Sequence, residues 1–542
     1  MKRTLTILAT VIVIGVATCL LIKKPAGTSP AQDRPLVVGF ENDVPTFDPL
    51  RLNNVFALRV GSQVFEGLTR LDESNQVVGA VADSWIHSPD LRMWTFHLRN
   101  GVKFHTFSAL DEASRGVTAE DVVYSFTRML SKDAVTAGPL ASVLKGAKEY
   151  QEGKVSAVSG LRIISPREVE FSLTRQDALF PGRISSPAYS IVKKAVVDAA
   201  GADFGQKVAV GTGPFQFVER RGNDLVFSRY NQYWGGNGGG TVETVIFRTV
   251  KEDAVRLAEA KAGRLDVTYA SPPMLEGLVE RQGGELRIKD SSVKSLTLQS
   301  FPIFNTTFLA FNYPKLDPDL RRAIALAVDR NEVVKAVVPM TGIPAAGPIP
   351  LACAGYQTQV KNVRDLDAAK AALQAYRQKH PGVNPKLRVL THELAQSVPI
   401  SEILQSQLKN IGIEVDIVQQ SFNAVVGLLQ KGDFDAVSIG FEYQYSLPQL
   451  ILENFFTSAA IPLPNVFYYN KPENDAAISA LFTIRDEAVS LKQAADIEER
   501  LVADAPGVFL FQTHQVILLN PALDGVMFNG ANFPILNHST WK

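Results

Sequence analysis

Two glycine-rich segments have the composition of phosphate-binding loops, but neither has the full spacing. Gly211-Thr212-Gly213 lacks the third glycine of a dinucleotide fingerprint, and Pro214 follows where that pattern needs conformational freedom. Residues 235–240, GGNGGG, lack the Gly-Lys-Ser/Thr ending of a phosphate loop. Neither segment predicts a nucleotide site, and we interpret 235–240 as a flexible connection between strands.

The side chains that could serve a hydrolase or a metal enzyme are scattered. The sequence has no Gly-x-Ser-x-Gly elbow and no His-Glu-x-x-His helix. His392-Glu393 stands alone, and His97 and His105 have no cysteine or third histidine close in sequence. We therefore expect no catalytic residues, no cofactor and no metal site, and we do not expect an enzyme.

Charge and cysteine content exclude further classes. The chain has 542 residues with 55 Lys+Arg and 55 Asp+Glu, so its charge balance gives no indication of a nucleic-acid partner. At about 100–200 residues per domain, this length predicts two to four structural units. The two cysteines, Cys19 and Cys353, exclude a disulfide framework in the body of the chain, and we interpret Cys353 as a small buried hydrophobic residue.

The N-terminus has the pattern of an export signal. Lys2-Arg3 precede an apolar run that continues to Ile22, and a Pro/Ser/Gly-rich linker covers residues 23–34. Three alternatives fit residues 1–22: a signal peptide cleaved after Ala31, a retained membrane anchor of about 20 residues, or lipidation at Cys19. All three place the body of the protein outside the cytoplasm.

Elements of two kinds follow. In the first half, Trp94–Phe104 alternates around Asn100-Gly101, which predicts a hairpin, and Thr118 is placed to cap a helix that reaches about Leu130. Residues 387–441 then alternate strand, helix, strand, helix and strand, with Gly412 and Gly432 ending the helices. Such a run builds a parallel sheet whose ligands bind beyond the carboxyl ends of the strands, so residues 440–441 are the first indication of a site.

A colinear set of short blocks covers nearly the whole chain after the linker, and it resembles the family 5 extracellular solute-binding proteins. The blocks are TFDPL (46–50), VFEGL (64–68), ADSW (82–85), WTFHLR (94–99), VKFH (102–105), TAEDVVYS (118–125), GTGPF (211–215), NQYWGG (231–236), GRLDV (263–267), RRAIALAVDR (321–330), LKNIGIEV (408–415), GDFD (432–435) and AP (505–506). Proteins of this family are the peptide- and nickel-binding components of ABC importers.

The resemblance implies an α/β protein with the bilobed periplasmic-binding-protein fold, type II, in its large three-domain form with a hinge between the lobes. Lobe I would join residues 35–77, 205–300 and 507–542. An inserted domain would cover 78–204, and lobe II would cover 301–506. The chain crosses between lobes at least twice, so the crossings can act as hinges.

In peptide-binding relatives an extended ligand pairs with protein strands inside the cleft. By block matching, the ligand-facing stretches here would be 41–45, 308–312 and 440–445. The candidate ligand-binding residues are Asp43, Val44, Phe308, Phe441, Glu442, Tyr443, Gln444 and Tyr445.

The chain departs from its relatives at two places. Many of them read Gly-Trp-x-x-Asp-Tyr-x-Asp-Pro where residues 440–448 read GFEYQYSLP, so the aspartate that pairs with the ligand amine falls on Gln444 and the second falls on Leu447. A buried ammonium needs a carboxylate. Either Glu442 or Asp43 supplies that charge, or the ligand has no free amine. The second departure is an insertion of about seven residues (relative to the family spacing) between residues 105 and 117, which we interpret as a surface loop.

The resemblance therefore implies a substrate-binding protein that captures peptides or similar solutes between its lobes and delivers them to ABC permease subunits in the inner membrane. We expect a monomer in the periplasm or another extracytoplasmic space, with or without a membrane tether. Two alternatives stay open. The ligand could be a sugar, an opine-like metabolite, nickel or haem, or the protein could report its ligand to a membrane receptor.

Overall fold

The computed structural model describes residues 34–542 apart from residues 53, 133, 135–137, 284, 362–363 and 394–395. Within this part of the chain, no helix has the length and apolar character needed to cross a membrane. The three alternatives for residues 1–22 concern residues outside it.

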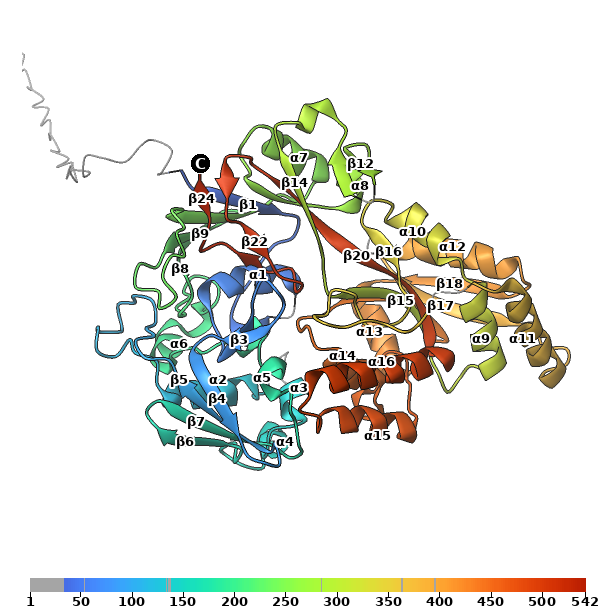
Figure 1. Ribbon diagram of the computed structural model, residues 1–542, viewed down its shortest axis with the longest axis horizontal. Helices are drawn as coiled ribbons and strands as arrows, with labels where there is room; N and C mark the ends of the chain where they lie inside the picture. The colour runs from blue at the N-terminus through green and yellow to red at the C-terminus, as the bar shows by residue number, and fades with distance from the viewer. Residues whose placement is uncertain are drawn as a thin grey trace, which may run out of the picture.

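One long mixed sheet runs through both lobes (Figure 1). Its strands are ordered β18-β17-β19-β15-β20-β11-β1-β10-β9-β8, and β14 and β16 also pair with β20. In lobe I they are β1 (Leu36–Phe40), β8 (Phe215–Arg221), β9 (Asp224–Arg229), β10 (Thr244–Thr249), β11 (Val267–Ala270) and β14 (Thr297–Pro302). In lobe II they are β15 (Asn305–Phe311), β16 (Gly342–Pro344), β17 (Lys386–His392), β18 (Glu414–Gln420) and β19 (Ala436–Glu442).

The strand β20 (Gly507–Leu519) is shared by the two lobes. Its first half pairs with β15 and β16, and its second half, from His514, pairs with β11 and β14. Figure 1 shows it in red, crossing the middle of the molecule. The chain also crosses where β14 leads into β15 through Ile303 and Phe304, which are both buried. The expected lobe boundary between residues 506 and 507 thus falls at the start of a strand that both lobes use.

Helices cover both faces of the sheet. In lobe II, α9 (Pro318–Ala327), α10 (Arg330–Val337), α11 (Leu366–Lys379) and α12 (Ser397–Lys409) contribute to one apolar core. The helices α13 (Phe422–Lys431), α14 (Pro448–Phe456), α15 (Pro472–Leu481) and α16 (Glu487–Ala503) contribute to the main core. In lobe I, α7 (Asp253–Lys261) and α8 (Pro272–Leu275) contribute to a third core, and α1 (Val55–Val64) joins the main core.

The inserted domain is built on a separate four-stranded sheet, β4-β5-β7-β6. Its elements are β4 (Ala82–His87), β5 (Met93–Leu98), α2 (Ala119–Met129), β6 (Leu161–Ser165), β7 (Glu168–Ser172) and α5 (Phe180–Arg183). A short hairpin of β2 (Thr69–Leu71) and β3 (Val77–Gly79) lies just before it in the chain.

Most of the elements predicted from sequence are confirmed. Residues 387–441 form β17, α12, β18, α13 and β19, and β17 pairs in parallel with both β18 and β19. Gly432 has a left-handed φ of 65° at the end of α13, the conformation that glycine adopts without strain. Thr118 caps α2, and its backbone N–H donates to the Asp121 carboxylate at 3.0 Å. Cys353 is buried, and burial raises the pKa of its thiol.

The hairpin predicted around Asn100-Gly101 is wrong. β5 pairs with β4 on one edge and with β7 on the other, so neither edge is left for residues 102–104. The chain after Gly101 pairs instead with the end of the inserted loop, where Val117 donates to the Val102 carbonyl and Phe104 to that of Arg115. The Arg115 side chain is buried and donates to the Phe104 carbonyl at 3.0 Å and to the Tyr230 hydroxyl at 2.5 Å, which fixes the loop to lobe I.

A buried ion network joins the inserted domain to lobe II. Arg183 donates from Nε to Asp177 at 2.7 Å and from Nη1 to Glu453 at 2.7 Å, and Arg175 also pairs with Glu453. The side chains of Arg183 and Asp177 are 1% and 0% exposed. Next to the network, the Ala178 N–H donates to the Phe482 carbonyl at 2.8 Å. These contacts hold the lobes together in this structure.

We expect Glu453→Gln to favour opening of the lobes. The substitution removes one charged partner from Arg183 and from Arg175. A hydrogen bond to a charged group contributes about 1.5–3 kcal/mol, which changes the equilibrium constant between closed and open forms about 10- to 100-fold. The ligand-free variant should have a larger radius of gyration by small-angle X-ray scattering. Asp198→Asn removes an exposed ion pair with Lys194 and should leave the radius unchanged. Equal radii for all three proteins would contradict the role of the network.

Candidate functional site

A cavity of about 690 Å³, open to solvent, lies between the lobes. Lobe I contributes Glu41, just after β1, and residues 269–273 at the end of β11 and the start of α8. Lobe II contributes residues 438–440 and Glu442 of β19 and, at the end of β17, His392. We call this space the interlobe cavity. It lies where strands β1, β11, β17 and β19 end, as the sheet rule predicts for a ligand site.

The β19 strand presents an unpaired edge beside this cavity. On one side it pairs with β15 along its whole length, from Ala436 to Glu442. On the other side β17 pairs only with Ala436 and Val437, so from Ser438 onward this edge meets no other strand of the described residues. Free N–H and C=O groups along a strand edge form a template for another extended chain.

The cavity carries negative charge from both lobes. Glu442 accepts a hydrogen bond from Asn532 Nδ2 at 3.2 Å, and its Oε1 lies 3.8 Å from Nη2 of Arg59 on α1. Burial raises the pKa of Glu442; Arg59 and then Asn532 oppose this, and the charge of Glu41 adds to it. Two carboxylates therefore face each other across the lobes, and Arg59 is the cation that acts on Glu442.

Several polar atoms at the cavity lack hydrogen-bond partners. The Tyr269 hydroxyl and the Ser438 hydroxyl are buried, and neither has a partner among the described residues. Behind the cavity lining, Asn532 Oδ1 is also buried without a partner, although its Nδ2 donates to Glu442 and Gln515, which both line the cavity. Buried polar groups are nearly always paired in native proteins. A bound ligand that supplies donors and acceptors would form the hydrogen bonds that these groups lack.

Residues 441–445 alternate between two environments. Phe441 and Tyr443 both pack edge-on against Phe455 of lobe II, and the Tyr445 hydroxyl accepts from Asn454 Nδ2 at 2.7 Å. Glu442 instead faces Arg59 and Asn532 in lobe I, as described above. Gln444 Oε1 accepts from the Ser186 hydroxyl of the inserted domain at 2.6 Å. The two polar residues therefore point towards the other side of the cleft, and the three aromatic residues pack in lobe II.

The other candidate residues lie elsewhere. Phe308 is fully buried in lobe II, stacked on Phe441 at 5.9 Å between ring centroids. Asp43 is exposed and pairs with Lys251 at 2.9 Å. Val44 is buried, and its carbonyl accepts from Arg220 at 2.7 Å. The structure thus places Glu41, and not Asp43 or Val44, against the interlobe cavity.

Sequence reasoning did not find four residues that line the cavity or contact the polar residues at the cleft. Tyr269 lines the cavity, Arg59 and Asn532 contact Glu442, and Ser186 contacts Gln444. Arg59 is on the buried face of α1, where its guanidinium lies 4.2 Å from the Tyr269 ring. Asn532 has a positive φ of 64° in the C-terminal segment. Only Tyr269 carried a signal, because it lies at the end of a strand whose neighbours also end at the cleft. The others depend on contacts between segments far apart in sequence.

The described residues contain no group of three or more His, Cys, Asp or Glu side chains arranged to hold a metal ion. His105 is buried with its Nε2 2.9 Å from the Gly213 carbonyl oxygen, and burial lowers its pKa to about 4. It is therefore neutral and holds two chain segments together. The polar groups that line the interlobe cavity are suited to binding a ligand by hydrogen bonds and charge.

Comparison with known proteins gives consistent results. The sequence profile of the bacterial extracellular solute-binding proteins, family 5 (middle region), matches residues 76–462. The periplasmic oligopeptide-binding protein OppA of Escherichia coli is 26% identical over 92% of this chain and 91% of its own. The dipeptide-binding protein of E. coli is 26% identical over 71% of each chain.

Solved structures share the fold. HbpA2 from Haemophilus parasuis has a TM-score of 0.78 at 21% identity, covering 94% of this chain and 100% of its own. The periplasmic binding protein DppA from Helicobacter pylori, in complex with the peptide STSA, has a TM-score of 0.74 at 20% identity, covering 93% and 97%. These likenesses confirm the bilobed α/β fold expected from the sequence. Because the family profile matches more than half of its residues, the chain belongs to the family 5 bacterial extracellular solute-binding proteins.

Proposed function

We propose that this protein captures peptides, or similar solutes with a cationic amine, in the interlobe cavity and delivers them to an ABC permease. The observation that carries the proposal is the unpaired edge of β19 from Ser438 to Glu442, which lines the cavity. An extended peptide can add to this edge as a further strand through main-chain hydrogen bonds. Such pairing does not depend on the side chains of the ligand, so it suits loose sequence selectivity.

Relatives support the peptide class. The curated proteins of similar sequence include dipeptide-, oligopeptide- and murein-peptide-binding proteins, and a heme-binding protein is among them as well. We infer a place outside the cytoplasm, permease subunits as partners and no covalent chemistry. A monomer remains our prediction.

Glu442 is the residue that we assign to the ligand's amine. Asp43 is exposed and paired with Lys251, whereas Glu442 lies in the cavity beside the free edge, with Glu41 opposite. Gln444 already accepts a hydrogen bond from Ser186 and acts as a neutral contact between the lobes. The negative charge expected at position 444 is therefore replaced by charge two residues earlier in the chain, at the last residue of β19.

Closure supplies the mechanism. In this structure the lobes meet through polar contacts such as Ser186–Gln444 and Arg183–Glu453, which can break and reform. A ligand that contacts both lobes has a higher affinity for the closed state and shifts the population towards it. The closed form with its cargo is then the species that a permease recognises.

We expect a bound peptide to compact the protein and to stabilise it. Because ligand binds only the folded closed form, a concentration of about 100 times the Kd should add about 2.7 kcal/mol to the free energy of unfolding. Differential scanning fluorimetry measures the rise in Tm, and small-angle scattering measures the radius. The Glu453→Gln variant, which starts more open, should show the larger change in radius. A peptide that raises Tm without changing the radius of either protein would contradict binding between moving lobes.

We expect Glu442→Gln to weaken binding of a peptide with a free amine by about one to two decades, since one charge-assisted hydrogen bond is lost. The N-acetylated form of the same peptide should bind both proteins alike. Glu219→Gln, on the surface of lobe I, serves as the matched control. Isothermal titration calorimetry of the two peptides against the three proteins measures these affinities.

The same assignment predicts a pH dependence. Burial raises the pKa of Glu442, so protonation removes its charge at a higher pH than for an exposed glutamate. Affinity for the free-amine peptide should fall as pH decreases from about 7 to about 5, and Glu442→Gln should flatten that change. If the variant follows the same pH profile as the parent protein, another group binds the amine.

A further inference from the structure

A second pocket, of about 120 Å³, lies inside lobe I, away from the interlobe cavity. Its walls come from the end of α1, from β2 and from residues 533–538 of the C-terminal segment, and the inserted domain adds Ser185 and Pro187. None of its lining residues belongs to lobe II. Closure of the lobes is therefore not needed to form it. We call it the Arg70 pocket, after the side chain at its centre.

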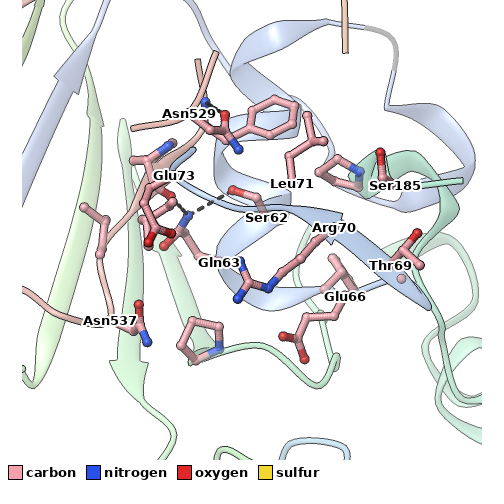
Figure 2. A pocket seen from close by; sticks show the side chains of 18 of the residues that line it. Ser62, Gln63, Glu66, Thr69, Arg70, Leu71, Glu73, Ser185, Asn529 and Asn537 are labelled. Atoms are coloured by element: carbon pink, nitrogen blue, oxygen red, sulfur yellow. Dashed lines mark hydrogen bonds between the residues drawn. The ribbon is translucent and has the colours of Figure 1, made fainter. Parts of the chain in front are cut away.

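Figure 2 shows the Arg70 side chain extending into this pocket, between Gln63 and Glu66. Its Nε atom is buried and has no hydrogen-bond partner, and the side chain forms no ion pair with the described residues. A guanidinium group has five N–H donors and no acceptor. Leaving the Nε donor buried without a partner is costly, because its hydration has been lost and not replaced.

The neighbouring carboxylate, that of Glu66, forms no hydrogen bond or ion pair with Arg70. Glu66 is buried, and its oxygens accept from the Tyr233 hydroxyl, the Trp234 indole and the Thr212 hydroxyl, each at 2.8 Å. Arg70 acts on Glu66 only through its charge. The three donors hold Glu66 in a fixed orientation. The Arg70 donors are therefore still available to a molecule in the pocket.

The rest of the lining defines what that molecule must be. Asn529 and Asn537 bring side-chain amides to the pocket, and Leu71, Phe533 and Ile535 are apolar (Figure 2 draws the two amides and Leu71). A planar carboxylate can accept two parallel hydrogen bonds from one guanidinium. Glu66 and the exposed Glu73 lie on the same lining, so a singly charged anion is favoured over a doubly charged one.

The geometry points to a binding site for a small monocarboxylate in this pocket, held by Arg70 with Asn529 and Asn537 and with its apolar body against Leu71 and Phe533. It is separate from the peptide site proposed above and goes beyond that function. The volume leaves room only for a small molecule, below the usual size range of drug-sized pockets. A lobe that binds such an anion can do so in the open and in the closed form alike.

Isovalerate tests the proposal, with its neutral amide, isovaleramide, as the matched probe and inorganic phosphate as the dianionic one. We expect isovalerate to raise the Tm of the purified protein and to give a saturable calorimetric titration. Isovaleramide should not bind, and phosphate should bind more weakly than isovalerate. Saturation by isovaleramide equal to that by isovalerate, or no binding of isovalerate, would overturn the proposal.

Arg70→Met tests the assignment to this residue. It should abolish isovalerate binding, Arg70→Lys should weaken it by about tenfold, and Arg92→Gln, which changes an exposed arginine, should have no effect. Arg70 has no hydrogen bond or ion pair to lose, and Glu66 keeps its three hydrogen-bond donors, so the ligand-free Arg70→Met protein should melt close to the parent. A clear fall in its Tm would mean that the arginine is structural and would overturn the assignment.

Two further measurements separate this site from the peptide site. Glu453→Gln should leave isovalerate affinity unchanged, because the pocket has no wall from lobe II. Arg70→Met should leave peptide affinity unchanged even though isovalerate no longer binds. If Arg70→Met weakens peptide binding instead, the pocket is part of the interlobe cavity and the proposal of a separate site is wrong. Failure of peptide binding in the parent protein would overturn only the proposed function.

Discussion

The structure depends on one hydrogen-bonded sheet that passes without interruption through two lobes. The strand β20 is paired along its whole length, first with strands of lobe II and then with strands of lobe I. Its hydrogen bonds prevent the lobes from separating at this crossing. The second crossing, through Ile303 and Phe304, is fixed in the same region, because Phe304 donates to the Gly530 carbonyl and its own carbonyl accepts from Tyr443. Motion is therefore confined to bending about these two crossings.

This restriction explains how an exposed strand edge is tolerated. An open edge is a risk in a soluble protein, because it can pair with the edge of another molecule. Here the free edge of β19 starts at Ser438, where β17 no longer pairs with it, and lobe I stands opposite, so a second folded sheet cannot reach it. A single extended chain can. Under the proposed function, the cavity would thus select its ligand by shape before any side chain takes part.

The sequence was informative where local pattern determines structure. The strand–helix alternation at residues 387–441 and the Thr118 cap were predicted because they depend on hydrophobic periodicity, glycine C-caps and a side chain close in sequence. The hairpin at Asn100-Gly101 was mispredicted because strand pairing depends on which edges are free, and both edges of β5 were already occupied. Block matching selected residues 441–445, and of these the structure places Glu442 on the lining of the interlobe cavity. It could not say which of them face lobe I, since Arg59, Ser186 and Asn532 come from distant segments.

Hydrogen bonding separates structural polar groups from candidate binding groups in this protein. Buried Glu498 accepts hydrogen bonds from Tyr356, Thr358 and the Ile349 N–H, and Glu66 likewise has three donors. The hydrogen bonds of both carboxylates are therefore already used within the fold. The Tyr269 and Ser438 hydroxyls and the Arg70 Nε are buried without partners, and all three belong to residues that line a cavity. Folding stability alone gives no reason to keep an unpaired buried donor where an apolar side chain would fit. At these three residues, the polar atoms that have no partner in the fold are therefore available to a molecule in the adjoining cavity.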